Sequence, residues 1–469
     1  MSKRGHDVSL RLLKALNVAL IVACFAAVWY LYYADIVISP FFRKGNWAVI
    51  LIFAVQYIAL GRTYDGFLIS YNRISQIIYS QSLAVAVSDG FMFVIIWLLA
   101  KSFPWIVPGI LTLLAQVFII TLWAVFSHHW YYKKFEPQKT IVVYDVREGL
   151  ERLIDEYGFN RKFEVTATIP VHECLEHLDS LKGLGTVFLS GIHSHERNII
   201  LKYCIANGIR VMVIPRVGDV IMSSAKKMHL FYLPMLMVER CTLTPEYELI
   251  KRVGDILISG AALVILSPVI GITAAAIKLT DKGPVFYKQT RLTKDGKEFR
   301  ILKFRSMRVD AEKDGVARLS TGADDDRITP IGRIIRAVRL DELPQLINVL
   351  KGDMSIVGPR PERPEIAAQY EQEMPEFRLR LQMKAGITGY AQVYGKYNTT
   401  PYDKLQMDLM YIAHPNIVED LAIMFATIKI LFLPESTEGV DPGQVTALDY
   451  ENEANRTEKW EKRDEHWAD

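Results

Sequence analysis

The sequence predicts a membrane α/β protein: an N-terminal four-helix transmembrane bundle, a Rossmann-like α/β module, and a mixed α+β domain. Of its 469 residues, 51% are hydrophobic, and the mean hydropathy of +0.15 is high for a soluble protein. Apolar stretches dominate the start of the chain, whereas strand-like and helical patterns alternate later. The expected boundaries are 1–135 for the bundle, 140–239 for the module, 247–433 for the third part and 434–469 for a charged, mobile tail.

Four apolar stretches, at 13–33, 47–60, 83–100 and 106–126, are each near or somewhat below bilayer-spanning length. The first is too long and aromatic for a cleaved signal peptide, so we expect it to be retained. Lysine and arginine gather before the first stretch, in the second loop and after the fourth stretch. The positive-inside rule therefore predicts a multi-pass protein of the inner (cytoplasmic) membrane, with everything after Lys133 in the cytoplasm.

Charge, cysteine and histidine content argue against several kinds of site. A net charge of +3 gives no basis for nucleic-acid binding, and the four scattered cysteines form no CxxC pair. His193 and His195 form an HxH pair, but a solvated loop is favoured over a metal site because no third ligand is evident.

Asp89, inside the third apolar stretch, is either functional or a structural acid facing the bundle; the lack of an obvious partner favours the second reading.

Residues 140–239 carry buried strand patterns at 141–146, 186–190 and 209–215, with helical patterns between them. This alternation predicts the Rossmann-like module. A dinucleotide site would need a glycine-rich turn after the first strand, but the chain reads DVREG at 145–149. We therefore expect the module to lack a working phosphate loop.

Residues 247–278 start with basic side chains and continue with apolar residues, long enough in total for a fifth spanning helix. Ser267 and Pro268 lie in the middle of this segment. Proline lacks an N–H group and its ring clashes with the preceding turn, so we expect a sharp kink at this point. A complete span would also place the basic region that follows outside the cytoplasm.

The stretch 333–364 combines adjacent carboxylates, Asp341 and Glu342, with five arginines. Three of these arginines, including Arg336, recur at three-residue spacing, so on a helix they reach a common anion through planar guanidinium groups. Beside this positive charge both carboxylates should stay ionised, which suits a nucleophile or a metal ligand. In the alternative reading, Asp341 only caps a helix over 342–349 and the arginines form solvated ion pairs.

The surrounding segments supply further cations. Gly358 to Pro361 should hold an extended backbone, which places Arg360 and Arg363 at a defined reach. A hairpin is expected from 283–292 and 297–307, with its turn at 294–296, and its Lys303 and Arg305 should point to the side of the acid pair.

Three other segments lead to expectations about local structure. The loop 310–327 ends in three aspartates at 324–326, for which a solvated, mobile loop is favoured over a metal site. Residues 386–389, reading GITG, are expected to make a tight turn. Helices are expected at 403–412 and 418–432, and for the second of these a core position is favoured over the membrane surface.

Three motifs in this order carry a specific resemblance: KFRSM at 303–307, LDELPQLINVLKGDMSIVGPRPE at 340–362, and AGITGYAQVYGKYN at 385–398. The segment 247–433 resembles the bacterial sugar transferases, the polyprenyl-phosphate hexose-1-phosphate transferases, and among them the large monotopic phosphoglycosyl transferases that initiate exopolysaccharide, capsule or O-antigen synthesis. This resemblance implies a re-entrant membrane helix, broken at Ser267 and Pro268, followed by a mixed α+β catalytic domain that faces the cytoplasm.

The resemblance also implies a reaction. Hexose-1-phosphate would pass from a UDP-hexose, with glucose or galactose favoured, to undecaprenyl phosphate, with release of UMP and a phosphoryl-aspartate at Asp341. Mg²⁺ would be held by Asp341 and Glu342. Substrate phosphate would be bound by Arg336, Arg360, Arg363, Lys396, Lys303 and Arg305. Lys396 stands where the family commonly has arginine, so its contact would lack the planar fork.

Two other functions stay open: a non-catalytic membrane sensor or scaffold that binds UDP-sugar, and a glycosyltransferase that releases UDP. The expected partners are UDP-hexose, undecaprenyl phosphate and membrane lipid. The bundle and the module together suggest a dimerisation platform, so a homodimer is one option. No motif identifies the hexose, the polysaccharide pathway or the role of the module.

Overall fold

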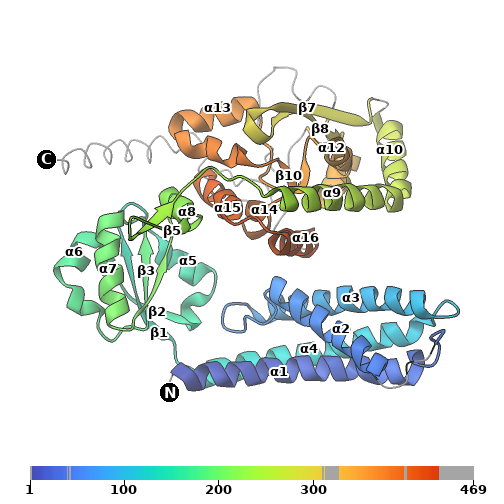
Figure 1. The fold of residues 1–469 in the computed structure, drawn as a ribbon, viewed down its shortest axis with the longest axis horizontal. Coiled ribbons are helices and arrows are strands. Elements are labelled where there is room, and N and C mark those ends of the chain that lie inside the picture. The colour runs from blue at the N-terminus through green and yellow to red at the C-terminus, as the bar shows by residue number, and fades with distance from the viewer. Residues whose placement is uncertain are drawn as a thin grey trace. The chain divides into compact units, whose positions relative to one another are not determined.

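The computed structural model describes residues 3–39, 41, 44–281, 283–308, 311, 327–395 and 399–431. The three aspartates at 324–326, Lys396 and the tail at 434–469 lie outside these residues. The chain divides into two units, Met1–Ile214 and Pro215–Asp469, and each is described by itself. Figure 1 shows their helices and strands.

Four long helices open the first unit, as the apolar stretches predict. They are α1 (Lys3–Val28), α2 (Lys44–Thr63), α3 (Ile74–Leu99) and α4 (Ile106–Lys134), and a π-helical turn, Trp29–Tyr33, continues α1 (Figure 1). All four are long and apolar enough to cross a membrane. Each begins earlier or ends later than its apolar stretch, because hydropathy marks the part that suits hydrocarbon and not the polar ends of the same helix.

Polar side chains inside the bundle face one another. Nδ2 of Asn17 donates to Oε1 of Gln81 at 3.1 Å, and the hydroxyl of Tyr57 donates to Oδ1 of Asn17 at 2.8 Å. Asp89 lines a small cavity together with Trp29, Thr112 and other residues of the bundle. Its side chain therefore points into the bundle, as the structural reading of this acid expects.

A parallel sheet completes the first unit. Its strands are β1 (Gln138–Tyr144), β2 (Phe163–Pro170), β3 (Thr186–Ser190) and β4 (Arg210–Val213), in the order β2-β1-β3-β4. One face packs against α6 (Val171–Glu176) and α7 (Ser194–Ala206), and the other against α5 (Leu150–Glu156) (Figure 1). Three of these strands match the predicted ones. The sequence analysis missed β2, because its burial alternates weakly and resembles no uninterrupted apolar run.

The second unit begins with α8 (Val217–Ser223) and the hairpin of β5 (Lys226–Leu230) and β6 (Leu233–Met237). Two helices follow, α9 (Pro245–Ile265) and α10 (Ser267–Asp281), and the pair is bent by 62° at its junction. Oγ of Ser267 donates to the carbonyl oxygen of Val264 at 2.8 Å, next to the proline that cannot donate. The predicted kink at Ser267 and Pro268 is confirmed.

Charged side chains of α9 attach it to the rest of its unit. Nζ of Lys251 contacts Oδ2 of Asp420 at 2.8 Å, and both side chains are more than nine-tenths buried. The hydroxyls of Tyr247 and Tyr411 also donate to the Asp420 carboxylate, at 2.7 and 2.6 Å. Both oxygens of the buried Asp420 carboxylate therefore accept hydrogen bonds from side chains of the same unit.

Two further side chains of α9 bond to backbone. Arg252 donates to the carbonyl oxygens of Val349 and Leu350, at 2.6 and 2.8 Å, near the end of α12 (Gln345–Lys351). Oδ1 of Asp255 accepts from the backbone N–H of Ile356 at 3.0 Å. Arg252 thus connects the kinked helix pair to the helix that follows the acid pair, and Asp255 connects it to the strand Ser355–Val357.

The predicted hairpin is formed by β7 (Phe286–Leu292) and β8 (Glu298–Phe304), with the turn at Lys294–Gly296. Asp295 and Gly296 both adopt positive φ, which suits the twist of a tight hairpin. The remaining helices are α11 (Pro330–Ala337), α13 (Pro364–Glu373), α14 (Tyr390–Tyr394), α15 (Pro401–Ala413) and α16 (Ile417–Leu431), with 3₁₀ segments at Leu340–Glu342 and Pro375–Gln382. The helices predicted at 403–412 and 418–432 are confirmed.

The tight turn expected at 386–389 is wrong. Residues Gly386–Thr388 form β10, a short strand that pairs in parallel with β9 (Ser355–Val357). A Cβ atom at Gly386 would collide with the backbone of Gly358. The glycine is therefore needed for a close approach of two backbones and not for a turn.

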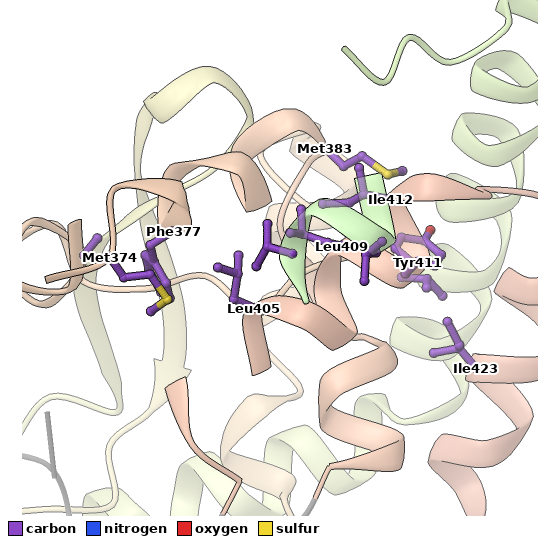
Figure 2. Close-up of a cluster of buried hydrophobic side chains, with 12 residues drawn as sticks. Met374, Phe377, Met383, Leu405, Leu409, Tyr411, Ile412 and Ile423 are labelled. Atoms are coloured by element: carbon purple, nitrogen blue, oxygen red, sulfur yellow. The ribbon is translucent and has the colours of Figure 1, made fainter. Parts of the chain in front are cut away.

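A hydrophobic core packs α15 against its neighbours (Figure 2). Leu405, Leu409 and Ile412 of α15 share this core with Phe377 and with Ile423 of α16. Ile423 is fully buried, so α16 contributes to the core, as the sequence analysis favours.

The buried Lys251–Asp420 pair leads to a stability prediction. Asp420→Ala leaves the ammonium group of Lys251 buried without its counter-charge, so we expect a loss of about 3 to 5 kcal/mol and a clearly lower midpoint of thermal unfolding. The exposed pair of Lys226 and Glu239, 3.5 Å apart, is the matched control, and Glu239→Ala should cost less than about 1 kcal/mol. Equal shifts for both variants in detergent-solubilised full-length protein would contradict the proposed importance of burial.

Candidate active site

The acid pair lies in a turn between two helices. Helix α11 ends at Ala337, and Arg339 then adopts a left-handed backbone with φ of 55°. This conformation reverses the chain into the 3₁₀ segment Leu340–Glu342. Arg336 therefore lies on α11, whereas Arg339 lies beyond its end, so the expected continuous helical row of arginines is interrupted.

The capping interpretation of Asp341 is wrong. Helix α12 begins at Gln345, with Pro344 at the capping position and no side-chain cap. Asp341 is three residues too early to cap this helix, and its carboxylate makes no hydrogen bond among the described residues. The structure thus leaves the Asp341 carboxylate available for another purpose.

The Glu342 carboxylate forms ion pairs with two cations. Its Oε1 lies 3.1 Å from Nζ of Lys303 and 3.0 Å from Nη2 of Arg360. Burial acts to raise the pKa of Glu342, but the charges of Lys303 and Arg360 outweigh burial and hold this pKa well below its usual value. Glu342 is therefore an anionic anchor between β8 and the segment after β9.

Asp341 differs from its neighbour in electrostatics. Burial raises the pKa of Asp341, and the charge of Glu342 adds to this effect, while Lys303, Arg336 and Arg360 oppose it. The expectation that both carboxylates stay ionised therefore stays a prediction for Asp341, because burial, the largest cause of its raised pKa, opposes the nearby cations.

The segment that carries Arg360 is held by backbone contacts on both sides. The N–H of Gly358 donates to the carbonyl oxygen of Thr388 at 2.9 Å, and the N–H of Gly386 donates to the carbonyl oxygen of Pro359 at 2.9 Å. These bonds join the second and third sequence motifs. A Cβ atom at Gly358 or Gly386 would collide with backbone atoms of the facing segment, which explains why both motifs contain glycine where they meet.

Two arginines that the sequence analysis did not select hold the same segment. The buried Arg380 donates to the carbonyl oxygen of Arg360 at 2.9 Å and to Oδ2 of Asp408 through Nε and Nη2, at 3.0 and 2.6 Å. Arg291 donates to the carbonyl oxygen of Pro361 at 3.1 Å. Burial lowers the pKa of Arg291 to about 10, still well above neutral pH. No sequence pattern distinguishes these anchors from surface arginines.

The other predicted cations are placed as follows. Arg305 is buried, and its guanidinium group packs against Gly283. Arg363 precedes α13, where it is the residue at the capping position. The charge of Arg336 acts on Asp341, and Lys396 lies outside the described residues. Among the predicted cations, Lys303 and Arg360 thus reach the acid pair by direct contact, in both cases with Glu342.

A small recess opens beside Glu342, the second residue of the acid pair. Asp341 is not among its lining residues, which are Arg291, Ile301, Lys303, Glu342, Gln345, Arg360, Pro361 and Gly386. Three of these residues are cationic and one is anionic, so the recess favours an anion. These cationic side chains can donate charge-assisted hydrogen bonds to the oxygens of a phosphoryl group.

The described residues contain no group of three or more histidine, cysteine or acidic side chains that could hold a metal ion. This result covers His193 and His195 as well. Asp341 and Glu342 supply two carboxylates, and Mg²⁺ in phosphate-transfer sites commonly uses one or two carboxylates together with substrate oxygens. The residues present therefore fit a Mg²⁺ ion that arrives with a phosphorylated substrate.

Comparison with known proteins places this site in a family. Residues 246–434 match the family model described as bacterial sugar transferase. The chain is 41% identical over 191 residues to a UDP-N-acetylgalactosamine-undecaprenyl-phosphate N-acetylgalactosaminephosphotransferase of Aeromonas hydrophila. It is 42% identical over 186 residues to a UDP-glucose:undecaprenyl-phosphate glucose-1-phosphate transferase of Escherichia coli (strain K12).

These two matches cover 40% and 39% of this chain, and 45% and 40% of the respective relatives. The chain thus spans less than half the length of these relatives. By contrast, 93% of the exopolysaccharide production protein PSS of Rhizobium leguminosarum bv. phaseoli is matched, at 43% identity over 188 residues and 38% of this chain. Together with the geometry of the acid pair, these matches show that the chain belongs to the bacterial sugar transferase family.

Proposed function

We propose that this protein transfers hexose-1-phosphate from a UDP-hexose to undecaprenyl phosphate and releases UMP, as the first membrane step of exopolysaccharide, capsule or O-antigen assembly. Glucose or galactose is the proposed hexose. The names of the relatives support a sugar phosphate as the transferred group and undecaprenyl phosphate as the acceptor. The observation that carries the proposal is the unequal acid pair, in which Glu342 binds two cations, whereas the Asp341 carboxylate forms no hydrogen bond or ion pair among the described residues.

The unequal pair supports a division of labour. A carboxylate oxygen of Asp341 attacks the β-phosphorus, and the bond between this phosphorus and the bridging oxygen breaks. UMP leaves with the bridging oxygen, and hexose-phosphate stays on Asp341 as an acyl phosphate. An oxygen of undecaprenyl phosphate then attacks the same phosphorus and releases the Asp341 carboxylate. No proton is gained or lost in either step.

Lys303 and Arg360 provide the electrostatic part of this reaction. Both are held by Glu342 and line the same recess as Glu342. A cation that is fixed before the substrate binds needs no reorganisation when negative charge develops on phosphoryl oxygens. Glu342 therefore acts as a positioning residue for the two cations, and Mg²⁺ bound by Asp341, Glu342 and substrate would neutralise further pyrophosphate charge.

The kinked helix pair supports a re-entrant arrangement. One substrate is a soluble pyrophosphate, whereas the phosphate of the other lies at the membrane surface, so the reaction requires a catalytic domain at the headgroup layer. A pair bent by 62° can enter one leaflet and return. Lys251 and Arg252 of α9 are bonded within the catalytic unit, which would hold the entrance of the pair beside it.

The first prediction concerns a covalent intermediate. Brief incubation of the parent protein with UDP-hexose and Mg²⁺, without lipid acceptor, should add the mass of hexose-phosphate at Asp341, and undecaprenyl phosphate should discharge it. Asp341→Asn should give no adduct, because the attacking oxyanion is absent. Glu342→Gln should form the adduct more slowly, because it loosens Lys303 and Arg360 without removing the nucleophile.

UMP release that requires both substrates together, with no adduct after rapid quenching, would refute this mechanism. Release of UDP would instead favour a glycosyltransferase. Binding of UDP-hexose without turnover would favour a sensor or scaffold.

A second prediction concerns the metal. Removal of divalent ions with EDTA should reduce UMP release to the background, and added Mg²⁺ should restore it, because two protein carboxylates alone hold Mg²⁺ weakly. Thermal unfolding should be nearly unchanged by EDTA, which separates loss of chemistry from loss of fold. Full activity in EDTA would show that the cationic side chains suffice.

A third prediction concerns topology. In a cysteine-free background, single cysteines at Glu248 and Lys282 should both react with an impermeant reagent only from the cytoplasmic side. A cysteine at Phe103, between α3 and α4, is the control and should react from the outside. Labelling of Glu248 and Lys282 from opposite sides of the membrane would exclude the re-entrant arrangement.

A further inference from the structure

Gln345 is an unexplained feature of the recess beside the acid pair. It is the first residue of α12, lies three positions after Glu342, and lines the same recess. Only 3% of its surface is exposed, and its amide makes no hydrogen bond among the residues that the structure describes. Its amide atoms are not among the fully buried polar atoms that lack a partner, so they are open to a group that occupies the recess.

Asn348, one turn later on the same helix, shows what a structural amide looks like here. It is equally buried, but its Nδ2 donates to the carbonyl oxygen of Arg300 at 2.8 Å and to Oδ2 of Asp353 at 3.2 Å. Its Oδ1 accepts from the N–H of Leu302 at 3.0 Å. The helix therefore carries one amide that holds the fold together and one, Gln345, that faces an open recess.

The charges around the recess indicate the chemistry of a group that would bind beside this amide. Arg291, Lys303 and Arg360 are cationic, and Glu342 neutralises only part of their charge. An anion is favoured in these surroundings, and an amide can meet an anion only through its N–H groups. Under the proposed function, the anion nearest to Asp341 is the phosphoryl group that Asp341 attacks.

We propose that Gln345 is a catalytic residue that donates an N–H hydrogen bond to one non-bridging oxygen of the transferred β-phosphoryl group. This inference rests on the proposed function and adds a substrate contact that the sequence motifs alone do not assign. The charges of Lys303 and Arg360 attract both non-bridging oxygens. The N–H hydrogen bond of an amide is directional, so it selects one of these two oxygens. No covalent bond forms or breaks at Gln345, and the amide keeps its protons throughout.

The test uses UDP-glucose donors in which sulfur replaces either non-bridging oxygen on the β-phosphorus, as two separate diastereomers. Sulfur accepts hydrogen bonds poorly, so the parent protein should react more slowly with one diastereomer than with normal UDP-glucose. Gln345→Ala should reduce UMP release from normal UDP-glucose about 10²-fold, the typical cost of one lost transition-state donor. The oxygen-to-sulfur rate ratio for the sensitive diastereomer should then fall towards the ratio of the other one.

Two variants keep the test specific. Gln345→Glu preserves the shape and the acceptor oxygen but removes the donor, so it should be at least as impaired as Gln345→Ala. Asn348→Ala should lower the thermal unfolding midpoint and leave the oxygen-to-sulfur ratios of the parent protein intact. This pair separates a missing donor from a disturbed helix.

Unchanged oxygen-to-sulfur ratios in Gln345→Ala for both diastereomers would overturn the assignment, as would full activity of Gln345→Glu. The second result would assign Gln345 as an acceptor from a hydroxyl group. If the parent protein releases no UMP from normal UDP-glucose or UDP-galactose, the proposed function fails first. The two failures are therefore distinguishable in one set of assays.

Discussion

The contact of Glu342 with Lys303 and Arg360 is the interaction on which the candidate site depends. It joins three segments that are distant in the sequence: strand β8, the turn before α12 and the loop after β9. A buried carboxylate between two cations is stable only while both partners stay in place. Glu342 therefore fixes the positions of Lys303 and Arg360 before substrate arrives. Among the described residues the Asp341 carboxylate forms no such ion pair, so the two adjacent acids differ in their surroundings.

Side chains of the kinked helix pair also contact segments that follow the acid pair. Arg252 of α9 donates to carbonyl groups near the end of α12, and Asp255 accepts from the backbone N–H of Ile356 in β9. Helix α12 starts three residues after Glu342, which contacts Lys303 and Arg360. The other end of α12 contacts Arg252 of α9. The kinked helix pair and the candidate site therefore belong to one connected structure. This connection would keep the shape of the site if, as proposed, the helix pair enters a membrane.

Much of this organisation can be predicted from the sequence because its signals are local. Apolar length marks the four helices, Pro268 marks the kink, and the turn at 294–296 marks the hairpin. Non-local contacts carry no such signal. The burial of Arg380 with Asp408 and the close approach of Gly386 to Gly358 depend on segments that meet only after folding. The proposed role of Gln345 has no sequence signal either, because an amide that is unpaired among the described residues differs from a paired one only in its surroundings.

The central claim is that Asp341 and the lipid acceptor attack the same phosphorus in turn. Each in-line displacement inverts the configuration at phosphorus, so two displacements restore it. The most direct measurement is the stereochemical course of complete transfer from a single β-phosphorothioate diastereomer of UDP-glucose to undecaprenyl phosphate. Overall retention of configuration is the predicted result. Overall inversion would contradict a phosphoryl-aspartate intermediate and would show direct attack by the lipid phosphate.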